Sequence, residues 1–215
     1  MSLKEKLEEK KAGSRQVIPA EALEVMDAAT VSLKDSGLAG KALGVGEKAP
    51  GFILLGVLSD EVSLDSLLAE GPVVLSFYRG AWCPYCNLEL AALRTALPEI
   101  EKAGAKLIAI SPQTPDNSLE TVKKSGVEFE VLSDVGNVVA RSYGLVFALP
   151  ESLRRVYSSF GIDLEKVDGD DSWELPLPAT YVIDKSGIVR YAFAEADYTK
   201  RAEPADVLEA LKAIS

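Results

Sequence analysis

The stretch PVVLSFYRGAWCPYCNLEL, residues 72–90, decides the fold and contains both cysteines of the chain. Its first seven residues form a continuous apolar run of the length expected for a strand that is buried on both faces. The residues RGAW then form a short loop, and leucines recur at near-helical spacing from Leu88 as far as Gly104. We therefore predict a buried strand, a loop and a helix that begins at or just after Cys83.

Strand-like and helix-like segments alternate along the rest of the chain. Further strands are predicted in GFILLGVL (51–58), AKLIAISP (105–112) and FEVLSD (129–134), with a late hairpin in ATYVIDKSGIVRYAFA (179–194). Helices are predicted in SDEVSLDSLLAEG (59–71) after a turn, in TPDNSLETVKKSG (114–126), in VGNVVARSYG (135–144) and in EPADVLEALKAIS (203–215). This order indicates an α/β fold with a mixed central sheet and helices on both faces.

Two regions stand apart from this alternation. Residues 1–40 are predicted to form a helical N-terminal extension, in which one helix starts near Pro19 and ends before Gly37. Residues 145–177 form a long excursion, for which we predict one helical piece and a polar loop rich in glycine and aspartate. The main domain is then expected to span residues 41–215.

Composition and charge exclude several classes of function. The net charge of −10 argues against nucleic acid and against an anionic membrane surface, because both require concentrated Lys and Arg. No apolar run approaches the ~20 residues of a membrane span, and the charged N-terminus does not resemble a signal peptide. We expect a cytoplasmic protein. The chain contains no histidine, which removes imidazole catalysis and histidine-ligated metal sites.

The two cysteines stand where the predicted strand hands over to the helix. A cysteine at a helix N-terminus faces unpaired backbone N–H groups and the positive end of the helix dipole, which stabilise its thiolate. A fall of the pKa from ~8.5 to ~7 corresponds to about 2 kcal/mol. Cys86 follows Cys83 by one turn, and Pro84 suits the first turn because its missing N–H is not needed there. The pair is therefore predicted to be redox-active.

Two other interpretations of the pair are weaker. A structural zinc site usually needs four ligands, and this chain offers only two soft ones, so no metal and no other cofactor is predicted. Two inert buried thiols are the second alternative, since cysteine often serves as a small apolar residue. A junction of strand and helix is a poor place for inert thiols, because it favours the thiolate.

The segments FYRGAWCPYCNLEL (77–90) and LPATYVIDKSGIVR (177–190) resemble the AhpC/TSA peroxiredoxin-like branch of the thioredoxin superfamily. The resemblance covers roughly residues 43–214 and implies a thioredoxin-like fold for the redox domain. It also implies a thiol peroxidase, in which a peroxidatic cysteine attacks a hydroperoxide and becomes a sulfenic acid. A second thiol resolves it, and thioredoxin or another thiol donor reduces the disulfide. A homodimer is plausible from the resemblance alone.

The resemblance leaves two assignments of the cysteines open. The peroxiredoxin pattern places the peroxidatic cysteine at Cys86 and an acidic residue at Glu89, with Cys83 in place of a Thr and Arg79 in place of a Pro. The thioredoxin WCxxC pattern makes Cys83 the exposed nucleophile and Cys86 its resolving partner. Both assignments end in a Cys83–Cys86 disulfide.

Four neighbouring positions complete the predicted site. Pro178 stands where peroxiredoxins carry an arginine that polarises the peroxide, and a thioredoxin fold places a cis-proline in this loop. Arg79 either supplies the missing guanidinium or is a solvated loop residue. Trp82 and Tyr85 bracket Cys83, either as packing or as an apolar lip for a partner's disulfide.

Three functions remain distinguishable by experiment. The first is a thiol-dependent peroxidase with an antioxidant role, acting on hydroperoxides. The second is a protein-disulfide reductase of thioredoxin type with little peroxidase activity. The third is a non-enzymatic binding protein whose partner surface is gated by the disulfide, with residues 1–40 or 145–177 as the interface.

Overall fold

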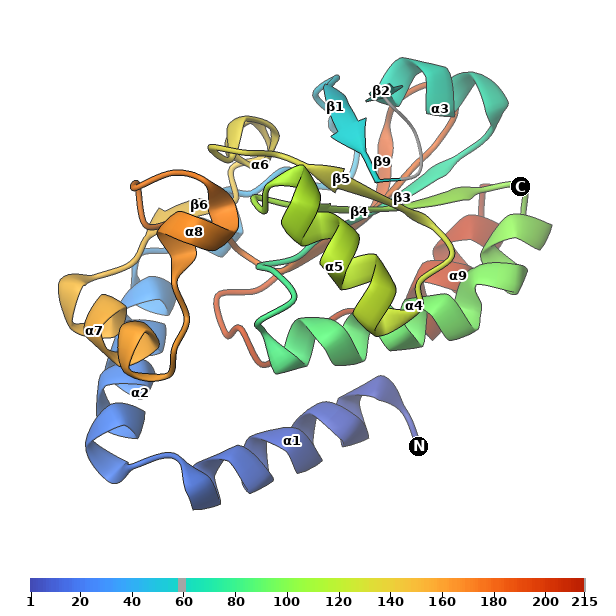
Figure 1. Ribbon diagram of the computed structural model, residues 1–215. Coiled ribbons are helices and arrows are strands. Elements are labelled where there is room, and N and C mark those ends of the chain that lie inside the picture. Colours follow the sequence, from blue (N-terminus) through green and yellow to red (C-terminus); the bar gives the residue numbers. More distant parts are fainter. Residues whose placement is uncertain (58–60, 215) are drawn as a thin grey trace.

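The computed structural model describes residues 1–57 and 61–214, and a mixed sheet runs through its centre (Figure 1). The sheet has seven strands within those ranges, in the order β2-β1-β5-β4-β3-β8-β9. The strands are β1 (Ile53–Gly56), β2 (Glu61–Ser63), β3 (Val73–Phe77), β4 (Lys106–Ser111), β5 (Glu130–Ser133), β8 (Ala179–Ile183) and β9 (Val189–Ala194). β3, β4 and β5 are parallel, whereas β8 pairs antiparallel with both β3 and β9. The predicted mixed sheet and late hairpin are confirmed.

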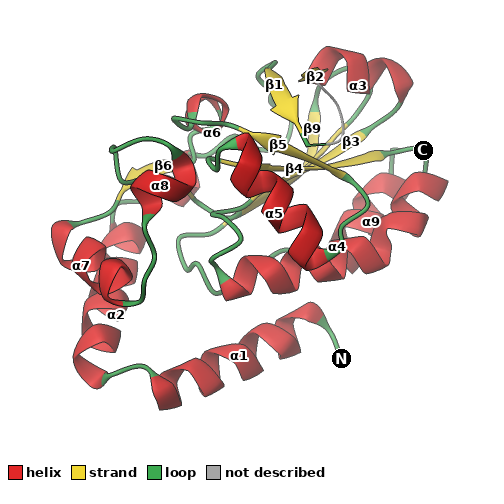
Figure 2. Ribbon diagram, viewed as in Figure 1, coloured by secondary structure: helices red, strands yellow, loops and turns green. Residues whose placement is uncertain are grey.

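Helices cover both faces of this sheet (Figure 2). They are α3 (Leu64–Glu70), α4 (Pro84–Lys102), α5 (Pro115–Ser125), α6 (Val138–Ser142) and α9 (Pro204–Lys212). Strand β3 shows the two layers, because Val74 packs in the core with α4 and α9 while Leu75 and Phe77 pack in the core on the other face. Alternate side chains of a strand point to opposite faces of the sheet, and both faces are buried at β3. This explains why PVVLSFY is apolar without a break.

The junction between β3 and α4 follows the prediction closely. All five residues of β3 are buried, and Cys83 is the N-cap of α4 with Pro84 in its first turn. Helix α4 continues across Pro98 to Lys102. The strand predicted over residues 51–58 is shorter in the structure, where β1 spans Ile53–Gly56. The turn predicted after it falls on residues 58–60, which lie outside the described residues.

The N-terminal extension is helical, as predicted. It consists of α1 (Leu3–Val17), α2 (Ala20–Asp35) and the 3₁₀ turn η1 (Leu38–Lys41). Helix α1 begins in a capping box between Ser2 and Glu5 and packs along α4, where it buries Leu3 and Leu7. Helix α2 packs on α7 (Glu151–Ser159) of the excursion (Figure 1). The extension is therefore part of the packed body, and its treatment as a separate domain of residues 1–40 stays a prediction.

The excursion carries more structure than the sequence indicates. The one helix predicted over residues 145–177 is present as α7, but the prediction was incomplete, because the segment also holds β6 (Val146–Ala148), α8 (Leu164–Asp168) and β7 (Glu174–Pro176). Strands β6 and β7 pair antiparallel with each other. Elements of three to five residues are too short to show a hydrophobic period, so only α7 was recognisable. Within the described part of the chain, none of the helices is both long and apolar enough to cross a bilayer.

Candidate active site

Both cysteines lie at the start of α4, and both are free thiols. Cys83 is 1% exposed and Cys86 is 0% exposed. The expectation that the Cys83 thiol is exposed is therefore wrong, whereas its role as nucleophile stays a prediction. The burial comes from tertiary packing. Tyr85 packs edge-on against Tyr198, with ring centroids 5.6 Å apart. Tyr198 lies in the loop after β9, which the local sequence does not place near α4.

Arg201 reaches the second cysteine from that same loop. Its Nη2 donates a hydrogen bond to Cys86 Sγ at 3.0 Å, and its Nε forms an ion pair with Glu89 on the next turn of α4. Its Nη1 donates to the backbone carbonyls of Tyr198 and Lys200 at 2.8 and 2.6 Å. A buried guanidinium is tolerable here because each of its nitrogens has a partner.

Glu89 completes the buried ion pair beneath the cysteines. Its Oε1 accepts long hydrogen bonds of 3.4 Å from Ser76 on β3 and from Thr180 on β8. Burial raises the pKa of Glu89, and the neighbouring Arg201 works against that rise. The acidic residue that the family resemblance places at position 89 is therefore joined to the thiols through Arg201.

Arg79 lies on the other side of the pair, in the loop between β3 and α4. It is 3% exposed, so it is not a solvated loop arginine. Its Nη2 donates to the Tyr157 hydroxyl at 2.7 Å, and its guanidinium carbon lies 4.7 Å from the ring centres of both Trp82 and Tyr198. Its Nε finds no hydrogen-bond partner among the described residues. One donor of this buried cation is therefore left without a partner in the described part of the protein.

The charges of Arg79 and Arg201 act on both thiols, and the ionisation of one thiol affects that of the other. Burial opposes ionisation, but the Cys86 thiol as a hydrogen-bond donor, together with the charges of Arg79 and Arg201, holds the pKa of Cys83 well below its usual range. The pKa of Cys86 is raised well above its usual range by burial and by the adjacent Cys83 thiolate. The first proton of the pair is released easily and the second is held. Cys83 is therefore the thiol of the pair that ionises more easily.

The loop that presents Arg79 is fixed by a glycine and a glutamine. Gly80 has a φ of +136°, and a Cβ atom there would come within 2.5 Å of Trp82 Nε1. The next residue, Ala81, donates its N–H to Gln113 Oε1 at 2.7 Å. Only glycine satisfies both the backbone angle and the close approach of the indole ring.

The remaining predicted residues lie around this centre with one correction. Trp82 is half-buried and packs at a tilt against Tyr157, with ring centroids 5.4 Å apart. Tyr85 is buried against Tyr198, so of the two interpretations packing holds for Tyr85. Pro178 precedes β8 near Arg79, but no peptide bond among the described residues is cis. The predicted cis-proline is therefore wrong for this chain. A proline at this position indicates the loop but not its isomer, because trans X-Pro bonds are favoured by default.

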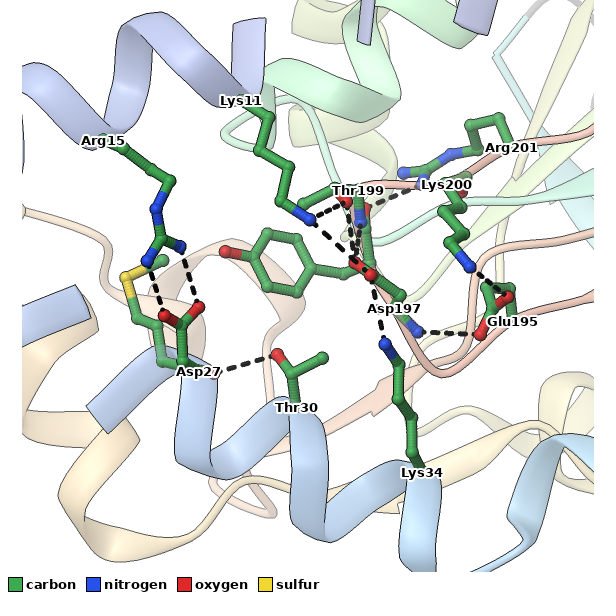
Figure 3. Close-up of polar contacts among 12 residues, drawn as sticks. Lys11, Arg15, Asp27, Thr30, Lys34, Glu195, Asp197, Thr199, Lys200 and Arg201 are labelled. Atoms are coloured by element: carbon green, nitrogen blue, oxygen red, sulfur yellow. Dashed lines mark hydrogen bonds and ion pairs between the residues drawn. The ribbon is translucent and has the colours of Figure 1, made fainter. Parts of the chain in front are cut away.

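An acidic residue ties the N-terminal extension to the loop after β9 (Figure 3). Asp197 lies between Lys11 of α1 at 3.7 Å and Lys34 of α2 at 3.2 Å, and it also accepts from the Thr199 hydroxyl at 2.7 Å. Burial opposes the shift, but the Thr199 hydrogen bonds and the two lysines lower the pKa of Asp197 to about 2. Both helices of the extension thus hold the loop that carries Arg201.

Sequence reasoning missed three of the residues in this centre: Tyr157, Tyr198 and Arg201. Arg201 stands in DYTKRAEP (197–204), which carries no recognisable motif, and its only signal is that the resemblance requires an arginine which position 178 lacks. The residues that the structure describes include no group of three or more Cys, Asp, Glu or His side chains placed to hold a metal ion.

Comparison with known proteins gives a consistent family. The sequence pattern of the AhpC/TSA family matches residues 45–192. The chloroplastic peroxiredoxin Q of Oryza sativa subsp. japonica is 33% identical over 148 residues, which cover 69% of this chain and 58% of that protein. The corresponding protein of Triticum aestivum is 30% identical over 175 residues, 81% of this chain and 70% of that protein. The chain therefore spans less than two thirds of the first of these relatives.

Solved structures agree on the fold. Peroxidoxin BcpB from Mycobacterium tuberculosis superposes with a TM-score of 0.63 at 22% identity, over 80% of this chain and 99% of that one. Peroxiredoxin Q from Xanthomonas campestris superposes with a TM-score of 0.56 at 22% identity, over 75% and 90%. At these identities the likeness shows the thioredoxin-like fold alone. Helices α1 and α2 both lie before the residues that match the family.

Proposed function

This chain belongs to the AhpC/TSA family, and on that premise we propose that it is a thiol-dependent peroxidase that reduces hydroperoxides through Cys83 and Cys86. The observation that carries the proposal is the charge arrangement at the start of α4. Two buried thiols hold one negative charge there between the guanidinium groups of Arg79 and Arg201. A thiolate is the nucleophile that attacks peroxide, and the two cations stabilise the negative charge that moves onto oxygen during the attack.

The reaction balances with these two thiols alone. The Cys83 thiolate attacks the outer oxygen of R–O–OH, the O–O bond breaks, and Cys83 becomes a sulfenic acid while an alkoxide leaves. The alkoxide takes the proton of the Cys86 thiol and departs as the alcohol. The Cys86 thiolate then attacks the Cys83 sulfur, which forms the disulfide and releases hydroxide. The hydroperoxide is reduced by two electrons, and the two thiols supply them.

The assignment of Cys83 as nucleophile follows the direction of the pKa shifts. The peroxiredoxin pattern favours Cys86, and the hydrogen bond from Arg201 to Cys86 fits that alternative. Cys83 is nevertheless favoured as the anion, because it is the N-cap residue of α4 and accepts a hydrogen bond from the Cys86 thiol. Cys86 keeps its proton until it transfers that proton to the leaving alkoxide.

The disulfide must then be reduced by an external thiol. A dithiol donor of thioredoxin type would exchange with it through a mixed disulfide, because each exchange step conserves one S–S bond. A reducing compartment such as the cytoplasm would supply such a donor and would keep the free thiols of the resting pair reduced. The cytoplasmic location, the identity of the donor and the homodimer stay predictions.

The proposal is tested by turnover with dithiothreitol as the reductant. Loss of cumene hydroperoxide should depend on the protein, and it should stop in Cys83→Ser, which lacks the nucleophile. In Cys86→Ser it should continue only as fast as dithiothreitol reduces the Cys83 sulfenic acid directly. In parallel, reduction of insulin disulfides without peroxide measures the alternative function. Rapid insulin reduction with no peroxide loss above the protein-free rate would replace the peroxidase with a disulfide reductase.

A further inference from the structure

An apolar cavity of about 320 Å³ lies between helix α2 and the excursion. Met26, Ala29 and Leu33 of α2 form one wall, and Phe147 and Leu153 face them. Ligand cavities for small molecules usually start near this size, and a water molecule occupies only about 30 Å³ of liquid. The cavity therefore has room for an organic group many times larger than hydrogen peroxide.

One end of the cavity is formed by residues that surround the thiols. Arg79, Tyr157 and Tyr198 all line it. The same three side chains lie close enough to Cys83 for the thiolate charge to act on each of them. Arg79 is the charged residue among the described ones that line the cavity, and its side chain is 3% exposed. The cavity thus has largely apolar walls and one buried cation near the nucleophile.

We propose that this cavity binds the organic group of a bulky apolar hydroperoxide, with the O–OH group held at Arg79, and that helix α2 makes the chain prefer such a substrate to hydrogen peroxide. The inference rests on the proposed peroxidase function and adds to it a specificity-determining wall. That wall lies outside residues 45–192, which match the family, so it belongs to the N-terminal extension of this chain.

The charges at the Arg79 end of the cavity favour an uncharged oxygen group over a carboxylate. Arg79 already faces the negative charge of the Cys83 thiolate, and the described residues give it no carboxylate partner. A carboxylate ligand would bring a second anion beside the thiolate, and like charges at short range repel strongly where burial lowers the dielectric constant. A hydroperoxide is uncharged until its O–O bond breaks, and its oxygen atoms accept hydrogen bonds from a guanidinium group.

The apolar walls supply the preference. Each methylene group that is moved from water into an apolar cavity strengthens binding by about fourfold. Hydrogen peroxide has no such group and gains nothing from the cavity. An organic hydroperoxide is held with its reactive end at Arg79, and this orientation raises the rate of attack by the thiolate.

Adjacent alanines on α2 provide a matched test. Ala29 faces the cavity, whereas Ala28 is exposed and does not line it. Reduced wild type, Ala29→Leu and Ala28→Leu are mixed with cumene hydroperoxide or with hydrogen peroxide, and the fast change in tryptophan fluorescence is followed. We expect Ala29→Leu to slow cumene hydroperoxide by about tenfold or more and to leave hydrogen peroxide within about twofold. Ala28→Leu should change neither rate.

A second variant covers the case in which Ala29→Leu disturbs the packing of α2 on α7. Ser32→Phe fills the rim of the same cavity from an exposed position and should give the same selective loss. Equal losses for both peroxides, or none for either in both filling variants, would overturn the inference and leave the peroxidase intact. A wild type that reacts with neither peroxide faster than free cysteine would instead overturn the proposed function.

Discussion

The Arg201 guanidinium donates a hydrogen bond to the sulfur of Cys86 at 3.0 Å, although 115 positions separate the two residues. The same guanidinium forms an ion pair with the buried carboxylate of Glu89. The active centre is therefore complete only when the loop after β9 has closed on the first turns of α4. Because Asp197 holds that loop to α1 and α2, the thiol chemistry depends on the N-terminal extension as well.

Removal of the Arg201 charge should make the thiols harder to ionise. Arg201→Met alone would leave Glu89 buried and unpaired at a cost of about 3–5 kcal/mol, so it is combined with Glu89→Gln. In the double variant the pKa of Cys83 should rise by about one unit or more, since a nearby opposite charge shifts a pKa by about 1–3 units. The pH dependence of iodoacetamide alkylation measures this pKa.

Glu89→Gln alone is the control for that experiment, because it keeps the Arg201 charge and removes a like charge near the thiolate. It should leave the pKa of Cys83 unchanged or lower it. If the double variant alkylates with the same midpoint as the wild type, Arg201 does not stabilise the thiolate.

The Asp197 carboxylate should stabilise the fold in a defined pH range. Its pKa is lowered to about 2 from an ordinary 3.8, so its contribution is fully present above about pH 4 and is lost as the pH falls towards 2. At pH 6, Asp197→Asn should lower the free energy of unfolding by about 2 kcal/mol, and the difference from wild type should shrink as the pH falls to 2. Urea unfolding at a series of pH values measures it.

The exposed pair of Arg15 and Asp27 on the same two helices serves as the comparison. Exposed ion pairs contribute about 0–1 kcal/mol, so Asp27→Asn should have a small effect at every pH. Equal effects of the two substitutions would show that the Asp197 cluster is no more than a surface ion pair.

Gly80 should not accept a side chain. In Gly80→Ala the new Cβ would meet the Trp82 indole and Gln113, and the φ of +136° is strained for any residue other than glycine. We expect a loss of about 1–3 kcal/mol in the free energy of unfolding and a slower reaction with peroxide, because the loop also orients Arg79. Gly13→Ala is the control, since nothing lies within 4 Å of that position in α1 and alanine favours a helix. A Gly80→Ala protein as stable and as active as wild type would contradict the account of the loop.

Local patterns in the sequence predicted the scaffold of the site, and long-range packing supplied the rest. The β3–α4 junction was predictable for two reasons. Burial of β3 on both faces makes its sequence apolar, and Pro84 together with the spacing of the leucines shows that the helix begins next to Cys83. The position of Arg201 was not, because it depends on how a loop without regular structure crosses α4. The burial of Cys83 was missed for the same reason.

The excursion shows a second limit of local reasoning. Its strands β6 and β7 have three residues each, so their pairing and not their sequence period defines them. Tyr157 lies on α7 within this segment and was recognisable only as part of a helix. Its hydroxyl contact with Arg79 joins positions 78 residues apart, which no local pattern encodes.

The central claim is that the Cys83 thiolate attacks the hydroperoxide and Cys86 resolves the product. The most direct test mixes reduced Cys86→Ser and Cys83→Ser with one equivalent of cumene hydroperoxide and follows the gain of one oxygen atom by rapid-quench mass spectrometry. We predict that Cys86→Ser forms a sulfenic acid at Cys83 at close to the wild-type rate. Cys83→Ser should react about a hundredfold more slowly, because burial opposes the ionisation of Cys86 and Cys86 does not stand at the N-cap of α4. Rapid oxidation of Cys86 in Cys83→Ser, with a slow reaction in Cys86→Ser, would contradict the account.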